Sequence, residues 1–261
     1  MQKLALTDQV FWNDKWNNLK VEIIPEGHYY FGRRGLFMRM IEREVGTLKG
    51  KLVIEIGGAG SYRLLALAKW GGAVVTALDY SEVGMSKTQQ IFDINGCEVK
   101  TIVSDFFEWE PDRHYDIVVH WGVLEHFTDP LPFLARCSKL LSFSSKMVFS
   151  MPNMSAWGAY FWKKWSSADY SRHIYHSYEE IKTACAKTDL EIKHAFYFDF
   201  PLLQITKWEK AGLGPLLVSV GQHGLNLLWK SIPIGQLGCK YISSNRGFKI
   251  IRKSHCSMIL L

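Results

Sequence analysis

The sequence lacks the cysteine pattern of a zinc-binding or disulfide-linked protein. It has only five cysteines in 261 residues, and no two of them stand in a CxxC or CxxxC spacing. A structural zinc site needs closely spaced ligand pairs, and a disulfide framework usually has an even number of cysteines. We therefore expect reduced thiols and a cytoplasmic protein.

Long uncharged apolar runs are also missing. No stretch reaches the roughly 18 residues that a membrane-spanning helix needs. The first residues lack the apolar core of a signal peptide, and Cys256 has too many residues after it for a prenylation box. With 48% hydrophobic and 21% charged residues, the composition is that of a globular chain and excludes a disordered one.

Acidic residues are absent after Glu209. The chain has a net charge of +6, but the part after Glu209 carries seven Lys and Arg residues, and the part before it has 24 basic and 25 acidic residues. Because the positive charge is confined to the end of the chain, we do not predict a nucleic-acid partner. This basic region surrounds an apolar segment at 213–229 with a narrow polar stripe at helical spacing. For residues 210–253 the sequence leaves three interpretations open: core packing, a dimer contact, or peripheral binding to an anionic membrane.

Apolar strands and helical segments alternate from residue 51 onward. This alternation predicts an α/β fold with a Rossmann-like, doubly wound sheet of seven strands, mostly parallel with an antiparallel last strand. In such sheets ligands bind beyond the carboxyl ends of the strands. The expected strands are 51–56, 74–79, 99–103, 115–121, 146–151, 191–198 and 248–252, and the expected helices between them are 62–69, 81–95, 131–141 and 177–188.

Other segments are predicted to surround this core. An aromatic cluster from Trp157 to Trp165 fits a cap over the site, or plain core packing, or a pocket for an apolar acceptor. The predicted organisation is a helical lid at 1–48, the core at 49–153, the aromatic cap segment at 154–176, a core helix and strand at 177–198, an amphipathic insertion at 199–245 and the last core strand at 246–253.

A glycine-rich loop follows the first predicted strand, with the sequence Glu55-Ile56-Gly57-Gly58-Ala59-Gly60-Ser61. The dinucleotide fingerprint GxGxxG is not met, because Arg63 stands where the third glycine would be needed. A carboxylate two residues before the first glycine would repel a pyrophosphate, whereas it can face the cationic amino-acid end of a ligand. The loop therefore favours a phosphate-free, positively charged cofactor.

Three further motifs stand at the ends of the second, third and fourth predicted strands: Asp79-Tyr80-Ser81, Ser104-Asp105-Phe106 and His120-Trp121-Gly122-Val123-Leu124-Glu125-His126. Together with the glycine loop, they resemble the class I S-adenosylmethionine (SAM)-dependent methyltransferases, in particular the small-molecule branch that includes the ubiquinone-biosynthesis O-methyltransferases. The resemblance covers about residues 50–153. It departs from the family's glycine pattern at Ala59 and Ser61, which are both small.

The resemblance implies that the chain binds SAM and releases S-adenosylhomocysteine. Asp79 would accept the ribose hydroxyls, Asp105 the exocyclic amine of adenine, and Phe106 would lie against the adenine ring. Arg33 or the neighbouring Arg34 would clamp the methionine carboxylate, and the alternative is that this basic pair is only solvated. The full set of cofactor-binding residues implied in this way is Arg33, Glu55, Gly57, Gly58, Ala59, Gly60, Ser61, Asp79, Tyr80, Ser81, Asp105, Phe106, His120 and Trp121.

Methyl transfer to a hydroxyl needs an aligned acceptor and a base. His126 lies where the acceptor should sit and is the expected base, with Glu125 or Asp129 as its orienter, while His173 and His176 approach from the cap side. The alternative is a structural His126 that is bonded to a backbone carbonyl. Glu125, His126 and Asp129 could also bind a metal ion, but because this short cluster has no remote ligand we predict no metal site.

The sequence therefore predicts transfer of a methyl group, by in-line displacement, to a hydroxyl of a small metabolite, sugar or lipid-type acceptor. Two alternatives stay open: N-methylation of a small molecule, and a non-catalytic SAM-binding subunit. Methylation of a nucleic-acid base is not predicted, because His120-Trp121-Gly122-Val123 replaces the acid/Asn-Pro-Pro-aromatic box of the enzymes that act on base amines.

Overall fold

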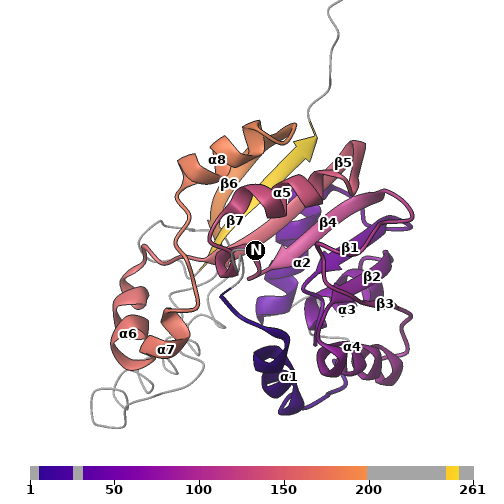
Figure 1. The fold of residues 1–261 in the computed structure, drawn as a ribbon. Helices are drawn as coiled ribbons and strands as arrows, with labels where there is room; N and C mark the ends of the chain where they lie inside the picture. The colour runs from indigo at the N-terminus through magenta and orange to yellow at the C-terminus, as the bar shows by residue number, and fades with distance from the viewer. Residues whose placement is uncertain (1–5, 26–31, 199–244, 253–261) are drawn as a thin grey trace, which may run out of the picture.

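The computed structural model describes residues 6–25, 32–198 and 245–252, and its centre is a seven-stranded sheet (Figure 1). The strand order is β3-β2-β1-β4-β5-β7-β6. The first five strands pair in parallel, and β7 is antiparallel to both β5 and β6. The strands are β1 (Leu52–Ile56), β2 (Val74–Asp79), β3 (Lys100–Val103), β4 (Tyr115–Trp121), β5 (Leu141–Pro152), β6 (Leu190–Phe198) and β7 (Asn245–Arg252).

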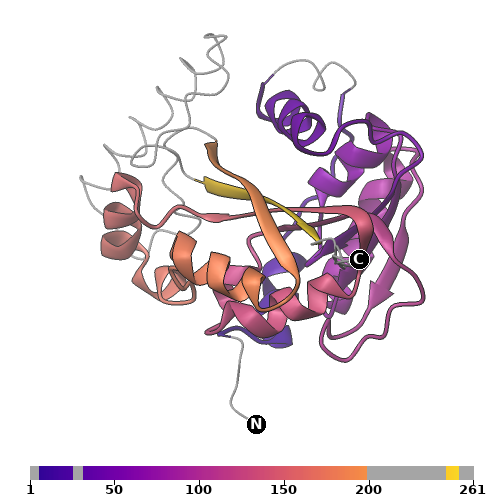
Figure 2. The same ribbon diagram turned by 90° about the horizontal axis from the view of Figure 1, so that it is seen from above.

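The central strands are apolar along nearly their whole length because both faces of the sheet are covered. On one face lie α2 (Gly32–Val45), α3 (Tyr62–Lys69) and α4 (Glu82–Ile94), and on the other lie α5 (Pro130–Ser138) and α8 (Tyr178–Ala186), as Figure 2 shows. Each face has its own core of buried side chains. The sheet is thus the rigid layer from which the connecting loops project.

Side-chain caps fix the residue at which several helices begin. Ser61 accepts a hydrogen bond from the backbone of Leu64 at the start of α3, and Ser81 does the same for Gly84 at the start of α4. Asp129 caps α5, which has Pro130 at its first position. Because these caps belong to the predicted motifs, they also fix where the motif loops end.

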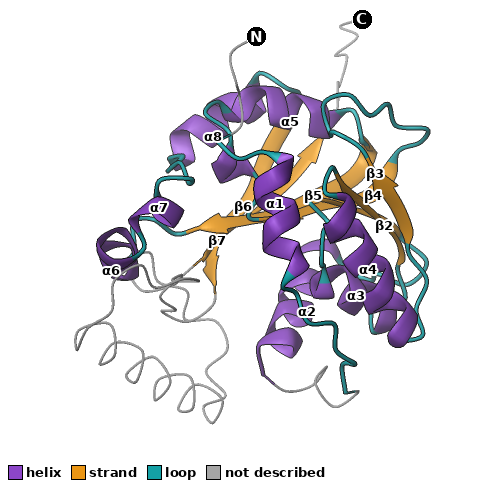
Figure 3. Ribbon diagram, turned by 60° about the horizontal axis from the view of Figure 1, so that its bottom comes forward, coloured by secondary structure: helices purple, strands orange, loops and turns teal. Residues whose placement is uncertain are grey.

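Three further helices lie outside the two helical layers. Figure 3 shows α1 (Gln9–Asn17) crossing in front of the sheet, where it packs against α4. The helices α6 (Trp157–Trp165) and α7 (Ser167–Tyr170) follow β5 and stand together away from β1 to β3. A 3₁₀ turn, η2 (Leu124–His126), follows β4.

The structure confirms the predicted fold class and the antiparallel last strand. The predicted helix over 131–141 ends at Ser138, because the chain from Leu141 onward already belongs to β5. Leu141 pairs with Tyr115 and Lys146 with Ile117, so an irregularity in register extends β5 beyond the predicted 146–151. None of the helices in the three described ranges is long and apolar enough to cross a membrane.

Two sequence predictions fall elsewhere in the chain. The apolar helix at 213–229 lies outside the described residues, and so does the contact surface at 210–253 except for β7.

Among the described cysteines, Cys97, Cys137 and Cys185 are free thiols.

Candidate functional site

The motif loops meet at one edge of the sheet. β2 lies on one side of β1 and β4 on the other, so the strand order changes direction beside β1. In an open α/β sheet, this change leaves a crevice beyond the carboxyl ends of the strands. The glycine loop follows β1 at this edge, Asp79 ends β2, and η2 follows β4.

Backbone geometry explains the glycines after β1. Gly57 and Gly60 have φ angles of +74° and +62°, which favour glycine. A Cβ on Gly57 would lie 2.5 Å from Cγ2 of Val123, and a Cβ on Gly58 would lie 2.9 Å from Cβ of Ala77. The loop can therefore approach β2 and η2 only because it has no side chains at these positions.

Thr88, which sequence reasoning missed, fastens this loop to α4. The backbone N–H of Gly60 donates to Oγ1 of Thr88 at 2.8 Å, and the Thr88 hydroxyl lies 2.8 Å from the carbonyl oxygen of Gly58. The side chain is fully buried. The sequence does hold a signal for this role of Thr88. A lone hydroxyl on the buried side of a predicted helix needs a hydrogen-bond partner from a neighbouring segment.

Glu55 is a buried carboxyl group at the end of β1. Its side chain is 3% exposed, and the Ser61 hydroxyl donates to its Oε2 at 2.6 Å. Burial raises the pKa of Glu55 to about 8, although the Ser61 hydrogen bond and the positive charge of Arg63 act in the opposite direction. A cationic ligand group at this place would favour the ionised carboxylate.

Asp79 lies at the end of β2 with its carboxylate held by the backbone. Its Oδ1 accepts a hydrogen bond from the N–H of Ser81 at 2.8 Å. Burial raises the pKa of Asp79 to about 6, against the effect of backbone hydrogen bonds from Ser81, Ala59 and Tyr80. Burial also raises the pKa of the Tyr80 phenol, which bonds with Thr7.

In the third motif, Asp105 lies at the surface and Phe106 lies in the core. Asp105 is exposed, and its Oδ1 accepts from the N–H of Phe107 at 2.7 Å. Phe106 is only 7% exposed, and its ring packs 5.2 Å from that of Phe133. Phe106 thus packs into the apolar core, where burial of its ring is favourable, and its contact with an adenine ring stays a prediction.

His120 and Trp121 likewise point to different sides. His120 is fully buried, with its ring stacked on Phe149 at 4.4 Å and edge-on to Phe133 at 4.9 Å. Burial lowers its pKa to about 3. The His120 ring therefore packs in the core, and its two ring nitrogens have no hydrogen-bond partner among the described residues. Trp121 packs edge-on against Phe37 on the opposite face.

The helix α1 lies over the glycine loop. A Cβ on Gly60 would be 2.9 Å from Cζ3 of Trp16. The Gln9 side chain donates to the carbonyl oxygen of Tyr80 at 2.6 Å, the Ser81 hydroxyl donates to Oδ1 of Asn13 at 2.7 Å, and the N–H of Leu6 donates to the carbonyl of His126 at 2.8 Å. The predicted lid is thus tied to three of the four motif loops. Arg33 lies in α2, and its side chain is outside the described part.

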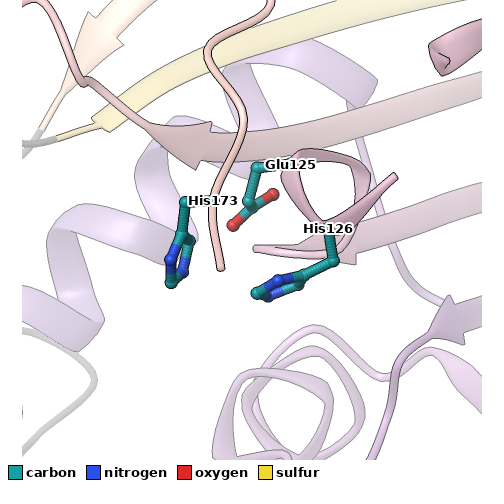
Figure 4. Close-up of side chains that lie close together, drawn as sticks. All are labelled: Glu125, His126 and His173. Carbon is teal, nitrogen blue, oxygen red and sulfur yellow. The ribbon is translucent and has the colours of Figure 1, made fainter. Parts of the chain in front are cut away.

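A second group of polar side chains lies beyond β4. Figure 4 shows Glu125 and His126 of η2 facing His173, which follows α7. The two imidazole rings have centroids 4.7 Å apart. Burial lowers the pKa of His126 to about 3, with a smaller effect from His173, and burial also lowers the pKa of His173.

The chain around His173 pairs with η2 through its backbone. The N–H of Ile174 donates to the carbonyl of Glu125 at 2.7 Å. His176 is 2% exposed, and its Nε2–H donates to the carbonyl of Phe127 at 3.0 Å, so its ring anchors this segment. Asp129 is used as the cap of α5 and does not join the cluster. The structure thus brings His173 to His126 but assigns His176 and Asp129 to structural contacts.

The residues at this edge fit the cofactor that the motifs imply. A Cβ at Gly57, Gly58 or Gly60 would collide with neighbouring protein atoms, so these three positions must be free of side chains. Beside them, Glu55 offers a buried carboxyl group to a cation. Two buried indole N–H groups, of Trp16 and Trp121, have no hydrogen-bond partner within the described residues. Buried donors normally have acceptors, so a polar ligand beside either indole would satisfy that N–H group.

Comparison with known proteins gives a consistent result. The model of a family described as methyltransferase domain matches residues 30–195. A ubiquinone biosynthesis O-methyltransferase from Coxiella burnetii is 34% identical over 122 residues, which are 44% of this chain and 49% of that protein. One from Actinobacillus pleuropneumoniae is 28% identical over 119 residues, or 43% of this chain and 50% of that protein. The chain thus spans about half the length of the curated relatives it matches.

Solved structures share the fold over nearly the whole chain. Magnesium protoporphyrin IX methyltransferase from Synechocystis, solved with bound S-adenosylhomocysteine, superposes with a TM-score of 0.57 at 16% identity and covers 95% of this chain and all of its own. A TehB-like SAM-dependent methyltransferase from Corynebacterium glutamicum gives a TM-score of 0.53 at 14% identity, covering 94% of this chain and 98% of its own.

Proposed function

The chain belongs to the family of class I methyltransferases that use S-adenosylmethionine, and from this premise we propose that it methylates a hydroxyl group of a small metabolite, sugar or lipid-type acceptor. One observation carries the proposal. At the carboxyl edge of the sheet, a glycine-rich loop and a buried carboxyl group lie at the end of β1, and a cluster with two imidazoles lies beyond β4. This arrangement supports a cofactor site and a place for proton removal on adjacent loops.

The chain's own residues would hold the cofactor at three points. Glu55 and the glycine loop face its cationic amino-acid end, Asp79 its ribose, and Asp105 its adenine. When bound, SAM supplies a methyl group that is already activated by the sulfonium charge. The protein's tasks are therefore to align the acceptor oxygen with that methyl group, to exclude water, and to remove a proton.

The acceptor is proposed to lie beside η2. The Nδ1–H of His126 is directed at a backbone carbonyl, so Nε2 is the ring atom at which a hydroxyl proton would be taken. Two sides of this place are aromatic: Trp12 of α1 lies edge-on to His126 at 5.3 Å, and Trp162 of α6 lies 4.6 Å from His173. Such walls exclude water and suit an acceptor with an apolar body. The names of the curated relatives support a hydroxyl acceptor.

The proposal is tested by transfer of labelled methyl groups from SAM to phenols, sugars and lipid alcohols, each paired with an amine of the same skeleton. We expect labelled ethers and a turnover at least a hundredfold lower in His126→Ala. The matched control is His114→Ala, an exposed histidine before the amino end of β4, which should keep its turnover. Label on amines alone, or undiminished turnover of His126→Ala, would contradict the proposal.

A further inference from the structure

Glu125, His126 and His173 form a compact set of metal-type ligand atoms. One such atom of each residue lies within 4.8 Å of those of the other two. Glu125 is 1% exposed and His126 7%, so the set is not a chance group of surface charges. In Figure 4 the Glu125 carboxylate points toward the two rings. Two imidazoles and one carboxylate are a ligand set of catalytic zinc sites, which keep further positions open.

The hydrogen bonds of the two histidines select their tautomers. Nδ1 of His126 lies 2.8 Å from the carbonyl oxygen of Arg172, and Nδ1 of His173 lies 2.8 Å from that of Asp169. A carbonyl oxygen can only accept, so both Nδ1 atoms carry the proton. In a neutral ring, Nε2 then has the lone pair. Histidines that bind metals commonly donate their other ring N–H in this way, which fixes the ring and its ligand atom.

His173 supplies the remote ligand that the sequence did not reveal. It is 47 positions from His126, but the hydrogen bond from Ile174 to Glu125 holds its segment against η2. Ligands from two separate segments are typical of a site that forms only in the folded chain.

We propose that Glu125, His126 and His173 bind one divalent transition-metal ion, for which zinc is the best match. Imidazole nitrogens and a carboxylate oxygen suit zinc better than magnesium, which prefers oxygen ligands alone. Bonds of about 2.0–2.2 Å bring ligand atoms to within roughly 3.5 Å of one another. The ligand atoms, which lie within 4.8 Å of one another, would have to move closer to reach that spacing when the ion binds.

The charges around the set are balanced. Lys15 of α1 and Arg172 are the nearby cations, and Asp169 and Glu125 are the nearby anions. With one carboxylate as ligand, a divalent ion keeps a positive charge, which would attract an oxygen anion of the acceptor at an open position.

The role of the ion in the reaction rests on the proposed function, because the ion would activate the hydroxyl group of the acceptor. The ion would lower the pKa of a coordinated acceptor hydroxyl, whose proton passes to solvent water. The oxygen lone pair then forms the new bond to the methyl carbon, while the bond from that carbon to sulfur breaks and its electron pair stays on sulfur. In the metal-bound chain, Nε2 of His126 would be a ligand, so the ion would take over the activation of the hydroxyl that the proposed function otherwise gives to this nitrogen. The loss of turnover expected for His126→Ala would then be the loss of a metal ligand.

The test is calorimetric titration of the chelator-treated full chain with zinc chloride, without cofactor or acceptor. We expect one ion per chain, and an affinity at least tenfold lower in His173→Asn and in Glu125→Gln. The control His114→Asn should bind as the wild type does. Because the buried Glu125→Gln variant could fail to fold, the cobalt(II) form of the partly exposed His173→Asn variant is compared as well, and it should lack the visible absorption of the wild-type form.

Absence of stoichiometric binding in the folded wild type, or unchanged affinity and spectrum in His173→Asn, would overturn the inference. The titration contains no methyl donor, so its outcome is independent of the proposed function. A chain that binds zinc but methylates only amines keeps the site and loses the proposed function. A chain that methylates hydroxyls but binds no zinc keeps the proposed function and loses the metal site.

Discussion

At the scale of single residues, Glu55 lies in surroundings that oppose its charge. Burial raises its pKa from 4.5 to about 8, and a single hydrogen bond from Ser61 offsets only part of that effect. The folded chain therefore binds this proton more tightly than the unfolded chain. The contribution of Glu55 to stability accordingly falls as the pH rises from about 4.5 to 8. A cation bound beside Glu55 would stabilise the ionised carboxylate and so offset the cost of its burial. This gives a physical reason for an acid just before the glycine loop.

This environment predicts a pH dependence of ligand binding. If the ammonium group of S-adenosylhomocysteine faces Glu55, binding must release the carboxyl proton at any pH below about 8. Affinity should therefore rise between pH 6 and 7.5, by at most about tenfold per pH unit. Isothermal titration in buffers of different ionisation enthalpy measures both the affinity and the released proton. In Glu55→Gln we expect weaker binding without the rise, whereas a wild-type affinity that does not change with pH would contradict this account.

At the scale of elements, α1 joins the loops that form the site. Its side chains reach Tyr80 and Ser81 through hydrogen bonds and His126 through the ring of Trp12, and these residues follow two different strands of the sheet. Trp16 closes over Gly60 from the same helix. Because α1 is short and none of its residues is fully buried, these side-chain contacts, and not a core of its own, hold it in place.

Asn13 offers a matched test of this role. Asn13→Ala removes the acceptor of the Ser81 hydroxyl, whereas Asn17→Ala makes the same change at an exposed position of α1. We expect a loss of about 1 kcal/mol in the docking of α1, or roughly fivefold faster amide hydrogen exchange in this helix, for Asn13→Ala only. Affinity for S-adenosylhomocysteine should fall by a similar factor. Equal exchange in the two variants would show that the bond to Ser81 does not hold the helix.

At the scale of the whole molecule, the pattern of strands and helices predicts the fold and the edge at which the site lies. The carboxyl ends of parallel strands share one edge, so motifs after β1, β2, β3 and β4 had to converge. What the pattern cannot give is the direction of side chains on strands buried on both faces. His120 of β4 is a residue of this kind, and its ring turns into the core. Phe106, in the turn after β3, is buried in the same core.

Contacts between distant segments were also beyond the sequence. His173 reaches His126 through backbone pairing of an irregular segment with η2, which leaves no periodic signal. Thr88 similarly fastens the glycine loop through a single buried hydroxyl. The motifs that follow regular strands could therefore be placed on the fold from the sequence, whereas the contacts around η2 could not, because they depend on how loops pack.

The central claim is that the loops after β1 and β2 form one SAM site, and titration of the full chain with S-adenosylhomocysteine tests it most directly. We predict binding at one site per chain, and an affinity at least tenfold lower in Asp79→Asn, because the ribose hydroxyls lose a charged acceptor. The control Asp93→Asn changes an exposed carboxylate of α4 and should bind as the wild type does. No binding by the folded wild type, or equal affinity in Asp79→Asn, would contradict the account.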